Sequence, residues 1–230
     1  MHEFFANPFF DALRTEHAHL AIGTVPALRY PSDVIPFAAL AEPTPDAMLA
    51  LAELLAHGEV FYLTGDHISS ICRTKNQIEY LKELPGWQYH FPSEDIPEPT
   101  SGHEVRELTA ADSAAMVALT DVAFPGYFRP RAYLLGPYYG IYIEDELIAM
   151  AGTRVCLPGY REISAICTHP QHVGRGHAAA LTRHILRANA DAGLRSFLHV
   201  LAANHRAIAL YERLGFTRTI PIQFHQMRRR

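Results

Sequence analysis

The segment THPQHVGRGHAAALTRHIL, residues 168–186, places a loop with two glycines between a short apolar run, residues 163–167, and an alanine-rich helical pattern. A loop of this kind leaves backbone N–H groups free at a helix N-terminus, where the helix dipole favours an anion. The sequence therefore predicts a strand, an anion-binding loop and a helix in direct succession, with phosphate as the first candidate ligand.

Two known phosphate-binding patterns can be checked against the residues of this loop. A P-loop needs Lys followed by Ser or Thr after its last glycine, and the His-Ala pair after Gly176 excludes it. The dinucleotide pattern G-x-G-x-x-A matches residues 174–179, but it should follow its strand directly and precede an acidic residue ~20 positions onward. Six residues separate Cys167 from this pattern, and the next strand ends at alanines. A glycine loop that only turns a strand into a helix is the alternative without function.

Length, composition and charge narrow the function classes. The 230 residues, 49% of them hydrophobic, can form one sizeable core or two small ones. A net charge of −4 argues against a broad basic face for nucleic acid. The most apolar stretch, 48–63, contains charged residues and is shorter than the ~18 apolar residues of a membrane span. The first ten residues lack a basic start, so we expect a cytoplasmic protein without a membrane partner.

The cysteines and histidines give no sign of a metal or disulfide framework. Cys72, Cys156 and Cys167 are too few and too scattered, and we expect buried reduced thiols. His169, His172 and His177 cluster around the glycine loop, but none has a carboxylate at helical spacing. We expect solvated histidines or a minor phosphate contact there, and no metal.

A proline-rich stretch, 91–102, divides the chain into an N-terminal α/β region, 1–100, and a second region, 103–230. The first region predicts helices over 8–20 and 44–58, the latter capped by Thr44, a strand over 59–65, a helical pattern over 76–84 and an apolar run over 87–91. The second region predicts strands over 103–108, 138–157 with a turn at 144–146, 162–167, 196–202 and 216–227, and helices over 110–124, 177–190 and 204–215.

From His103 to the C-terminus the sequence resembles a GCN5-related N-acetyltransferase (GNAT) domain, most closely of the FR47-like branch. Four features carry the resemblance: VGRGHA opening a helix after EISAIC, the lead-in LPGYREISAICTHP, Asn204 after SFLHVLA, and ALYERLGF at 209–216. The resemblance implies an α/β (α+β) fold, with a mixed, mostly antiparallel central sheet flanked by helices and an additional α/β N-terminal region.

The same resemblance implies that the loop binds acetyl-CoA. In the family pattern R/Q-x-x-G-x-G/A, backbone amides cradle the pyrophosphate, and glycine provides the room. Val173 departs from the usual Arg or Gln, which leaves Arg175 to supply charge. The residues expected to contact the coenzyme are Ile166, Cys167, Thr168, Val173, Gly174, Arg175, Gly176, His177, Ala178, Asn204 and Tyr211.

Acetyl transfer from a thioester to an amine needs a neutral amine, a stabilised carbonyl oxygen and a proton for the leaving thiolate. The resemblance places the Tyr211 phenol beside the sulfur as the acid, against the alternative of a core aromatic. Glu162 is placed as the base, with a solvated strand-end glutamate as an equal alternative. Backbone N–H groups near Cys167 and Thr168 would face the carbonyl oxygen. Asn204 is also an ordinary N-cap.

The resulting hypothesis is an N-acyltransferase that uses acetyl-CoA directly, without an enzyme-bound acyl intermediate; Cys167 lacks an evident His partner for covalent catalysis. The acceptor is a primary amine of a small molecule or amino acid. Tyr127, Phe128, Arg129 and Arg131 would suit a carboxylate, with packing against the N-terminal region as an equal alternative. Alternatives are a non-catalytic acyl-CoA sensor and, disfavoured by the acidic balance, a transferase using charged tRNA. The sequence leaves the oligomeric state open, a homodimer included.

Overall fold

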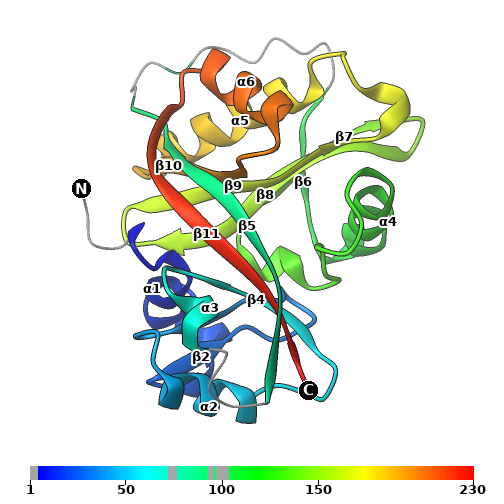
Figure 1. The fold of residues 1–230 in the computed structure, drawn as a ribbon. Coiled ribbons are helices and arrows are strands. Elements are labelled where there is room, and N and C mark those ends of the chain that lie inside the picture. The colour runs from blue at the N-terminus through cyan, green and yellow to red at the C-terminus, as the bar shows by residue number, and fades with distance from the viewer. Residues whose placement is uncertain (1–4, 72–76, 93–95, 97–103) are drawn as a thin grey trace.

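The computed structural model describes residues 5–71, 77–92, 96 and 104–230 (Figure 1). The strands are β1 (Ile22–Thr24), β2 (Ala27–Arg29), β3 (Ala38–Leu40), β4 (Val60–Thr64), β5 (Ile78–His90), β6 (Arg106–Leu108), β7 (Tyr138–Ile143), β8 (Glu146–Leu157), β9 (Tyr160–Thr168), β10 (Arg195–Leu201) and β11 (Thr217–Arg229). The α-helices are α1 (Pro8–Arg14), α2 (Pro45–Glu53), α3 (Ile68–Ile71), α4 (Ser113–Ala123), α5 (His177–Asp191) and α6 (His205–Arg213). Short 3₁₀ turns cover Ala18–Leu20, Ala110–Asp112, Ala132–Leu135 and Pro170–His172.

An eight-stranded sheet forms the centre of the molecule, in the order β4-β11-β5-β10-β9-β8-β7-β6. Every neighbouring pair is antiparallel except β9 and β10. This mixed, mostly antiparallel sheet flanked by helices confirms the predicted fold class. A separate three-stranded sheet, β1-β2-β3, lies with α1 and α2 at the lower end of the molecule in Figure 1.

Helices cover both faces of the large sheet. Leu181 and Ile185 of α5 pack with Ile148 of β8 and with Tyr211 of α6 in one apolar core. Phe9 of α1 belongs to a second core, which also contains Met116 of α4 and Met150 of β8. The i and i+4 spacing of Leu181 and Ile185 gives α5 its single apolar face. The sheet is thus buried on two sides, and the ends of its strands are left to form a site.

Most elements of the second region lie where the sequence predicts them. The turn at 144–146 has Glu144 and Asp145 at positive φ, as a tight hairpin requires. Thr44 caps α2 as expected, its hydroxyl accepting a hydrogen bond from the Ala47 N–H. The helix predicted over 8–20 is shorter, because α1 ends at Arg14 and only a 3₁₀ turn follows.

The helical pattern predicted over 76–84 is wrong. These residues, from Ile78 onward, belong to β5, which pairs with β11 and, toward its end, with β10. Gly86 allows this path, because a Cβ there would lie 2.8 Å from the Val200 carbonyl oxygen. Pairing with β11 along this stretch overrides the local helical preference. Residue 76 lies outside the described residues.

The sheet crosses the boundary that the sequence predicts near residue 100. β5 comes from the N-terminal region, yet it lies between β11 and β10 of the second region. β4 adds an edge strand beyond β11. Of the proline-rich stretch, 93–95 and 97–102 lie outside the described residues, as does Cys72. The N-terminal region is therefore a structural part of the main sheet.

Candidate functional site

The site begins where β9 and β10 separate. These parallel strands pair only at the start, the last pair being Phe197 with Glu162, and no further pair between them forms within the described structure. Beyond this point β10 continues beside β5, while β9 stays with β8. Backbone groups of β9 that would have faced β10 are therefore left at the wall of a gap between the two strands.

A β-bulge in β9 lies at this gap. Met150 pairs with Cys167 and Gly152 with Ser164, so β9 has one residue more than β8 in this interval. Ala165 takes up the irregularity at a φ of 52°, a rare conformation for a residue other than glycine. The strand opening that the resemblance implies around Cys167 and Thr168 is thus present, and the bulge lies just before these residues.

Two cavities occupy the gap. The loop cavity, about 490 Å³, lies between the end of β9, the glycine loop and α6. The aromatic cavity, about 250 Å³, lies between β9, β10 and the segment 124–138. The two linings share four residues: Phe124, Ile166, Asn204 and Tyr211. The cavities therefore meet at one place, beside the bulge.

The loop cavity brings together nearly all residues predicted to contact the coenzyme. Its lining includes Ile166, Cys167, Thr168, Val173, Gly174, Gly176, His177, Ala178, Asn204 and Tyr211. Gly174 and Gly176 have φ values of 82° and 85°. The left-handed conformation explains why glycine is needed at both positions. The roles of these residues in binding remain predictions.

The glycine loop ends at the N-terminus of α5. Gly176 is the N-cap, and its carbonyl accepts the first helical hydrogen bond, from the Ala180 N–H. Helix geometry leaves the preceding N–H groups without helical partners, and Ala178 and Ala179 line the loop cavity. The helix has no acidic residue in its first turn. This end of the loop cavity is therefore suited to a phosphate.

Arg175 is the one predicted coenzyme contact that does not line the loop cavity. Two other arginines, Arg206 and Arg213 of α6, do line it, together with Leu210. Sequence reasoning missed these two arginines. Arg206, Leu210 and Arg213 are spaced by four and three residues, which puts all three on one face of α6. This helical periodicity is the sequence signal that could have identified them.

Tyr211 lies at the junction of the two cavities. Its side chain is almost fully buried, and burial raises the pKa of its hydroxyl above the ordinary value. Among the residues that the structure describes, no side chain forms a hydrogen bond with this hydroxyl. A buried, protonated phenol at this junction can donate a proton to a group in either cavity.

Asn204 caps α6 and also lines both cavities. Its side-chain oxygen accepts a hydrogen bond of 3.1 Å from the Ala207 N–H, which confirms the predicted N-cap. This bond leaves the two N–H donors of the amide for another partner. The capping role and a contact with the coenzyme are therefore compatible, and the contact stays a prediction.

Glu162, expected either as the base or as a solvated strand-end glutamate, is fully buried and lines neither cavity. Arg154 holds it through two hydrogen bonds, Nε to Oε2 at 3.0 Å and Nη2 to Oε1 at 2.5 Å. His199 Nδ1 lies 2.7 Å from Oε1. Burial alone would raise the pKa of Glu162, but the charges and hydrogen bonds of Arg154 and His199 lower it to about 2.

A carboxylate with both oxygens occupied and such a low pKa is a weak proton acceptor at neutral pH. The geometry favours an electrostatic role for Glu162, which neutralises Arg154 and orients His199. An irregularity in β8 explains why Arg154 contacts Glu162. Thr153 pairs with Ile163 and Cys156 with Arg161, so β8 has one residue more than β9 opposite Glu162. This bulge allows the Arg154 side chain to reach the carboxylate.

His199 was not foreseen from the sequence. Its ring lines the aromatic cavity, and its Nε2 lies 2.9 Å from Nε2 of Gln88 on β5. Nδ1 thus donates to the Glu162 carboxylate, and Nε2 faces the Gln88 amide. One histidine on a predicted strand gives no sequence signal of this kind, because its partners come from β5 and β9.

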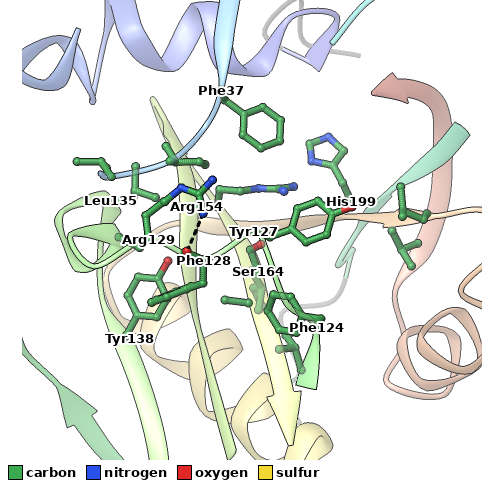
Figure 2. A pocket seen from close by; sticks show the side chains of 18 of the residues that line it. Phe37, Phe124, Tyr127, Phe128, Arg129, Leu135, Tyr138, Arg154, Ser164 and His199 are labelled. Atoms are coloured by element: carbon green, nitrogen blue, oxygen red, sulfur yellow. Dashed lines mark hydrogen bonds between the residues drawn. The ribbon is translucent and has the colours of Figure 1, made fainter. Parts of the chain in front are cut away.

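The aromatic cavity combines the N-terminal region with the segment 124–138. The N-terminal region contributes Val34, Ile35 and Phe37. From the second segment come Phe124, Tyr127, Phe128 and Arg129, whose side chains surround the cavity in Figure 2. The N-terminal region therefore contributes to this cavity. Of the four residues expected to suit a carboxylate on the acceptor, Tyr127, Phe128 and Arg129 line it.

Arg131 is the fourth predicted pocket residue, and it lies outside the aromatic cavity. Its guanidinium donates a 3.0 Å hydrogen bond to the Asp33 carboxylate, and both side chains are about half exposed. Arg154, which the sequence did not indicate, takes its place among the lining residues.

Two further observations concern the chemistry of the described residues. Burial raises the pKa of the Cys167 thiol to about 12, which makes a thiolate nucleophile unfavourable. In the described part of the chain, His, Cys, Asp and Glu side chains form no group of three or more that could hold a metal ion.

No helix within the described ranges has the length and apolar character to cross a membrane.

Comparisons with known proteins agree on one kind of fold. Residues 138–225 match the family model described as FR47-like protein. No curated protein matches the sequence. A putative acetyltransferase of the GNAT family from Novosphingobium aromaticivorans is 26% identical, with a TM-score of 0.87 and full coverage of both chains.

Two more distant structures share the fold. A GCN5-related N-acetyltransferase from Kribbella flavida is 17% identical, with a TM-score of 0.65 over 94% of this chain and 92% of that one. A GCN5-related N-acetyltransferase-like protein from Streptococcus suis is 14% identical, with a TM-score of 0.63 over 97% and 94%. All three similarities extend over the N-terminal region as well as residues 138–225.

Proposed function

We propose a reaction for this chain from one premise: it belongs to the GNAT superfamily, in its FR47-like branch. The proposed reaction is transfer of an acetyl group from acetyl-CoA to the primary amine of a small molecule. The observation that carries the proposal is the meeting of two cavities at Tyr211, beside the β9 bulge. One cavity suits a phosphate-bearing donor and the other a small acceptor.

The residues of the loop cavity fit acetyl-CoA as the donor. Its pyrophosphate would lie at the N–H groups of the glycine loop and the first turn of α5, where glycine leaves the backbone accessible. Arg206 and Arg213 add positive charge on the α6 side of the cavity. The pantetheine arm would then run along the free edge of β9 toward Tyr211.

The chemistry proposed is direct attack of the amine on the thioester carbonyl. A C–N bond forms, the C–S bond breaks, and the nitrogen loses a proton to solvent. Backbone N–H groups near the bulge stabilise the carbonyl oxygen as negative charge develops on it. The Tyr211 hydroxyl donates its proton to the leaving thiolate and is reprotonated from solvent. No enzyme-bound acyl intermediate is required.

Glu162 supports this reaction from behind the cavity wall. Because it stays ionised and paired with Arg154, it reduces the positive charge of the aromatic cavity without offering a free carboxylate. The amine must therefore enter as the neutral species or lose its proton to water. On this proposal Glu162 is a positioning residue for Arg154 and His199.

A transfer assay tests the proposal. The purified protein is incubated with acetyl-CoA and a panel of small amines, and free thiol and acetylated product are measured in parallel. We expect product in amounts equal to the thiol released. Tight binding of acetyl-CoA with no product from any amine would instead identify a non-catalytic acyl-CoA sensor and contradict the proposed reaction.

A further inference from the structure

The side chains that line the aromatic cavity carry more positive than negative charge. They include the two arginines Arg129 and Arg154, and no Asp or Glu. The remaining lining is largely apolar, with the rings of Phe37, Phe128 and Tyr138 among the contributors. The cavity therefore has no carboxylate that could pair with a further ammonium group on the acceptor, in addition to the amine that reacts.

The two arginines differ in what they already bind. Arg154 is neutralised by Glu162 through two hydrogen bonds, so its charge is largely satisfied. Arg129 donates from one terminal nitrogen, Nη1, to the carbonyl oxygens of Gly126 and Phe128 at 3.3 and 3.2 Å. Within the described residues, no carboxylate lies at ion-pair distance from Arg129. The positive charge of the cavity therefore resides mainly on Arg129.

Burial makes this charge effective. Arg129 is half-buried among aromatic side chains, where water screens a charge less than in bulk solvent. Its remaining N–H donors, on Nε and Nη2, form the planar pair that binds a carboxylate with two hydrogen bonds. The carbonyl bonds from Nη1 hold the guanidinium in place before a ligand arrives, which lowers the ordering cost of binding.

The size and walls of the cavity limit the rest of the acceptor. A volume of about 250 Å³ is below the ~300–1,000 Å³ of pockets for drug-sized ligands. The aromatic lining favours an apolar body. A polyamine or an aminoglycoside would bring additional positive charge into a cavity that already has an excess of it.

We infer that the acceptor is an amino-acid-sized primary amine with an apolar side chain and a carboxylate, and that Arg129 binds the carboxylate. The inference rests on the proposed transferase function and specifies its acceptor. The apolar body lies against the aromatic wall, and the amine extends toward Tyr211, where the two cavities meet. Arg129 thus acts as a specificity-determining residue.

The test compares each amino acid with its amide, which keeps the amine and lacks the carboxylate. The probes are glycine, L-leucine and L-phenylalanine, their amides, and spermidine, each at saturating acetyl-CoA. We expect kcat/KM for the leucine or phenylalanine acid to exceed that of its amide by at least tenfold, and spermidine to be a poor acceptor. In Arg129→Gln the acid should lose at least tenfold in kcat/KM, while the amide keeps its rate.

Arg131→Gln is the matched control, because Arg131 lies in the same segment but pairs with Asp33 outside the cavity. It should retain the preference for the acid. Amides or spermidine accepted as well as the acids, or an unchanged preference in Arg129→Gln, would overturn the inference while leaving the transferase function intact. Acetyl-CoA binding without transfer to any probe or to the wider amine panel would contradict the transferase function itself, and the acceptor inference with it.

Discussion

At the scale of single residues, Tyr211 has the most specific proposed role. Tyr211→Phe removes only the hydroxyl, so packing in the apolar core should be kept. We expect kcat to fall about 10²–10⁴-fold, the range typical of a lost general acid. The affinity for acetyl-CoA, measured by calorimetry, should stay within a factor of three. Tyr139→Phe, which alters a ring outside both cavities, should leave kcat unchanged.

Wild-type turnover in Tyr211→Phe would remove the proposed acid, even if acetyl-CoA binding were normal. A loss of acetyl-CoA binding together with turnover would instead show that the tyrosine acts in binding rather than as an acid. Steady-state rates and calorimetry on the same two variants separate these outcomes.

For Glu162 we predict an effect on the free energy of unfolding that depends on pH. Its pKa in the folded protein is lowered from the ordinary 4.5 to about 2. Its contribution to the free energy of unfolding is therefore complete above pH 4.5 and is lost as the pH falls toward 2. Glu162→Gln leaves Arg154 buried without its partner, and we expect a loss of about 3–5 kcal/mol at pH 7.

Urea unfolding of the wild type and Glu162→Gln at pH 7, 5 and 3.5 measures this contribution. The difference in the free energy of unfolding should be similar at pH 7 and 5 and smaller at pH 3.5. A difference that stays constant down to pH 3.5 would mean that Glu162 is not held ionised by Arg154 and His199.

Sequence reasoning located the residues of the site more reliably than their contacts. It predicted that Tyr211, Asn204 and the glycines contribute to the site, because a recognisable motif contains them, and all of them line the loop cavity. It predicted Glu162 as a base, but Glu162 lines neither cavity. Two bulges, one in β8 and one in β9, interrupt the alternation of side chains along these strands, and no local sequence pattern indicates them.

At the scale of elements, the glycine loop and the start of α5 form the unit that is proposed to hold the donor. Gly176 has a φ of 85° and Gly159, in the turn between β8 and β9, has a φ of 76°. A Cβ at either position would meet no atom within 4 Å. Valine at each should therefore cost a similar amount of stability from backbone strain, about 1–2 kcal/mol.

Only Gly176→Val should weaken acetyl-CoA binding, by at least tenfold, because only Gly176 lines the loop cavity. Calorimetry gives the affinities, and thermal unfolding shows whether the two variants are equally stable. Equal affinities in both variants, at equal stability, would show that the loop does not bind the donor.

Element prediction succeeded where local chemistry decides the structure. The hairpin turn at 144–146, the Thr44 cap and the strand–loop–helix unit are encoded by adjacent residues. The strand over 78–84 was not predicted because its conformation comes from pairing with β11, more than a hundred residues away. The segment alone, with Ile78, Leu81 and Leu84 spaced three residues apart, is compatible with a helix.

At the scale of the whole molecule, the N-terminal region and the second region share one sheet. Removing residues 1–102 would delete β5 from between β10 and β11 and expose the unpaired edges of both. We expect fragment 103–230 to be unfolded or aggregated, as judged by circular dichroism and gel filtration. The full chain should unfold in a single transition, seen in calorimetry.

A monomeric, cooperatively folded fragment 103–230 that binds acetyl-CoA would contradict this account and support two independent domains. The sequence could not decide this point, because a division in composition at a proline-rich stretch does not report which strands pair. The aromatic cavity depends on the same arrangement, since Val34, Ile35 and Phe37 reach it from the N-terminal region.

On the proposed function, the glycine loop and the separation of β9 from β10 form a site for acetyl-CoA. Calorimetric titration of the purified protein with acetyl-CoA, coenzyme A and NAD tests for this site. We expect micromolar binding of acetyl-CoA and coenzyme A and no binding of NAD. Absence of binding by both coenzyme A forms, or a preference for NAD, would contradict it.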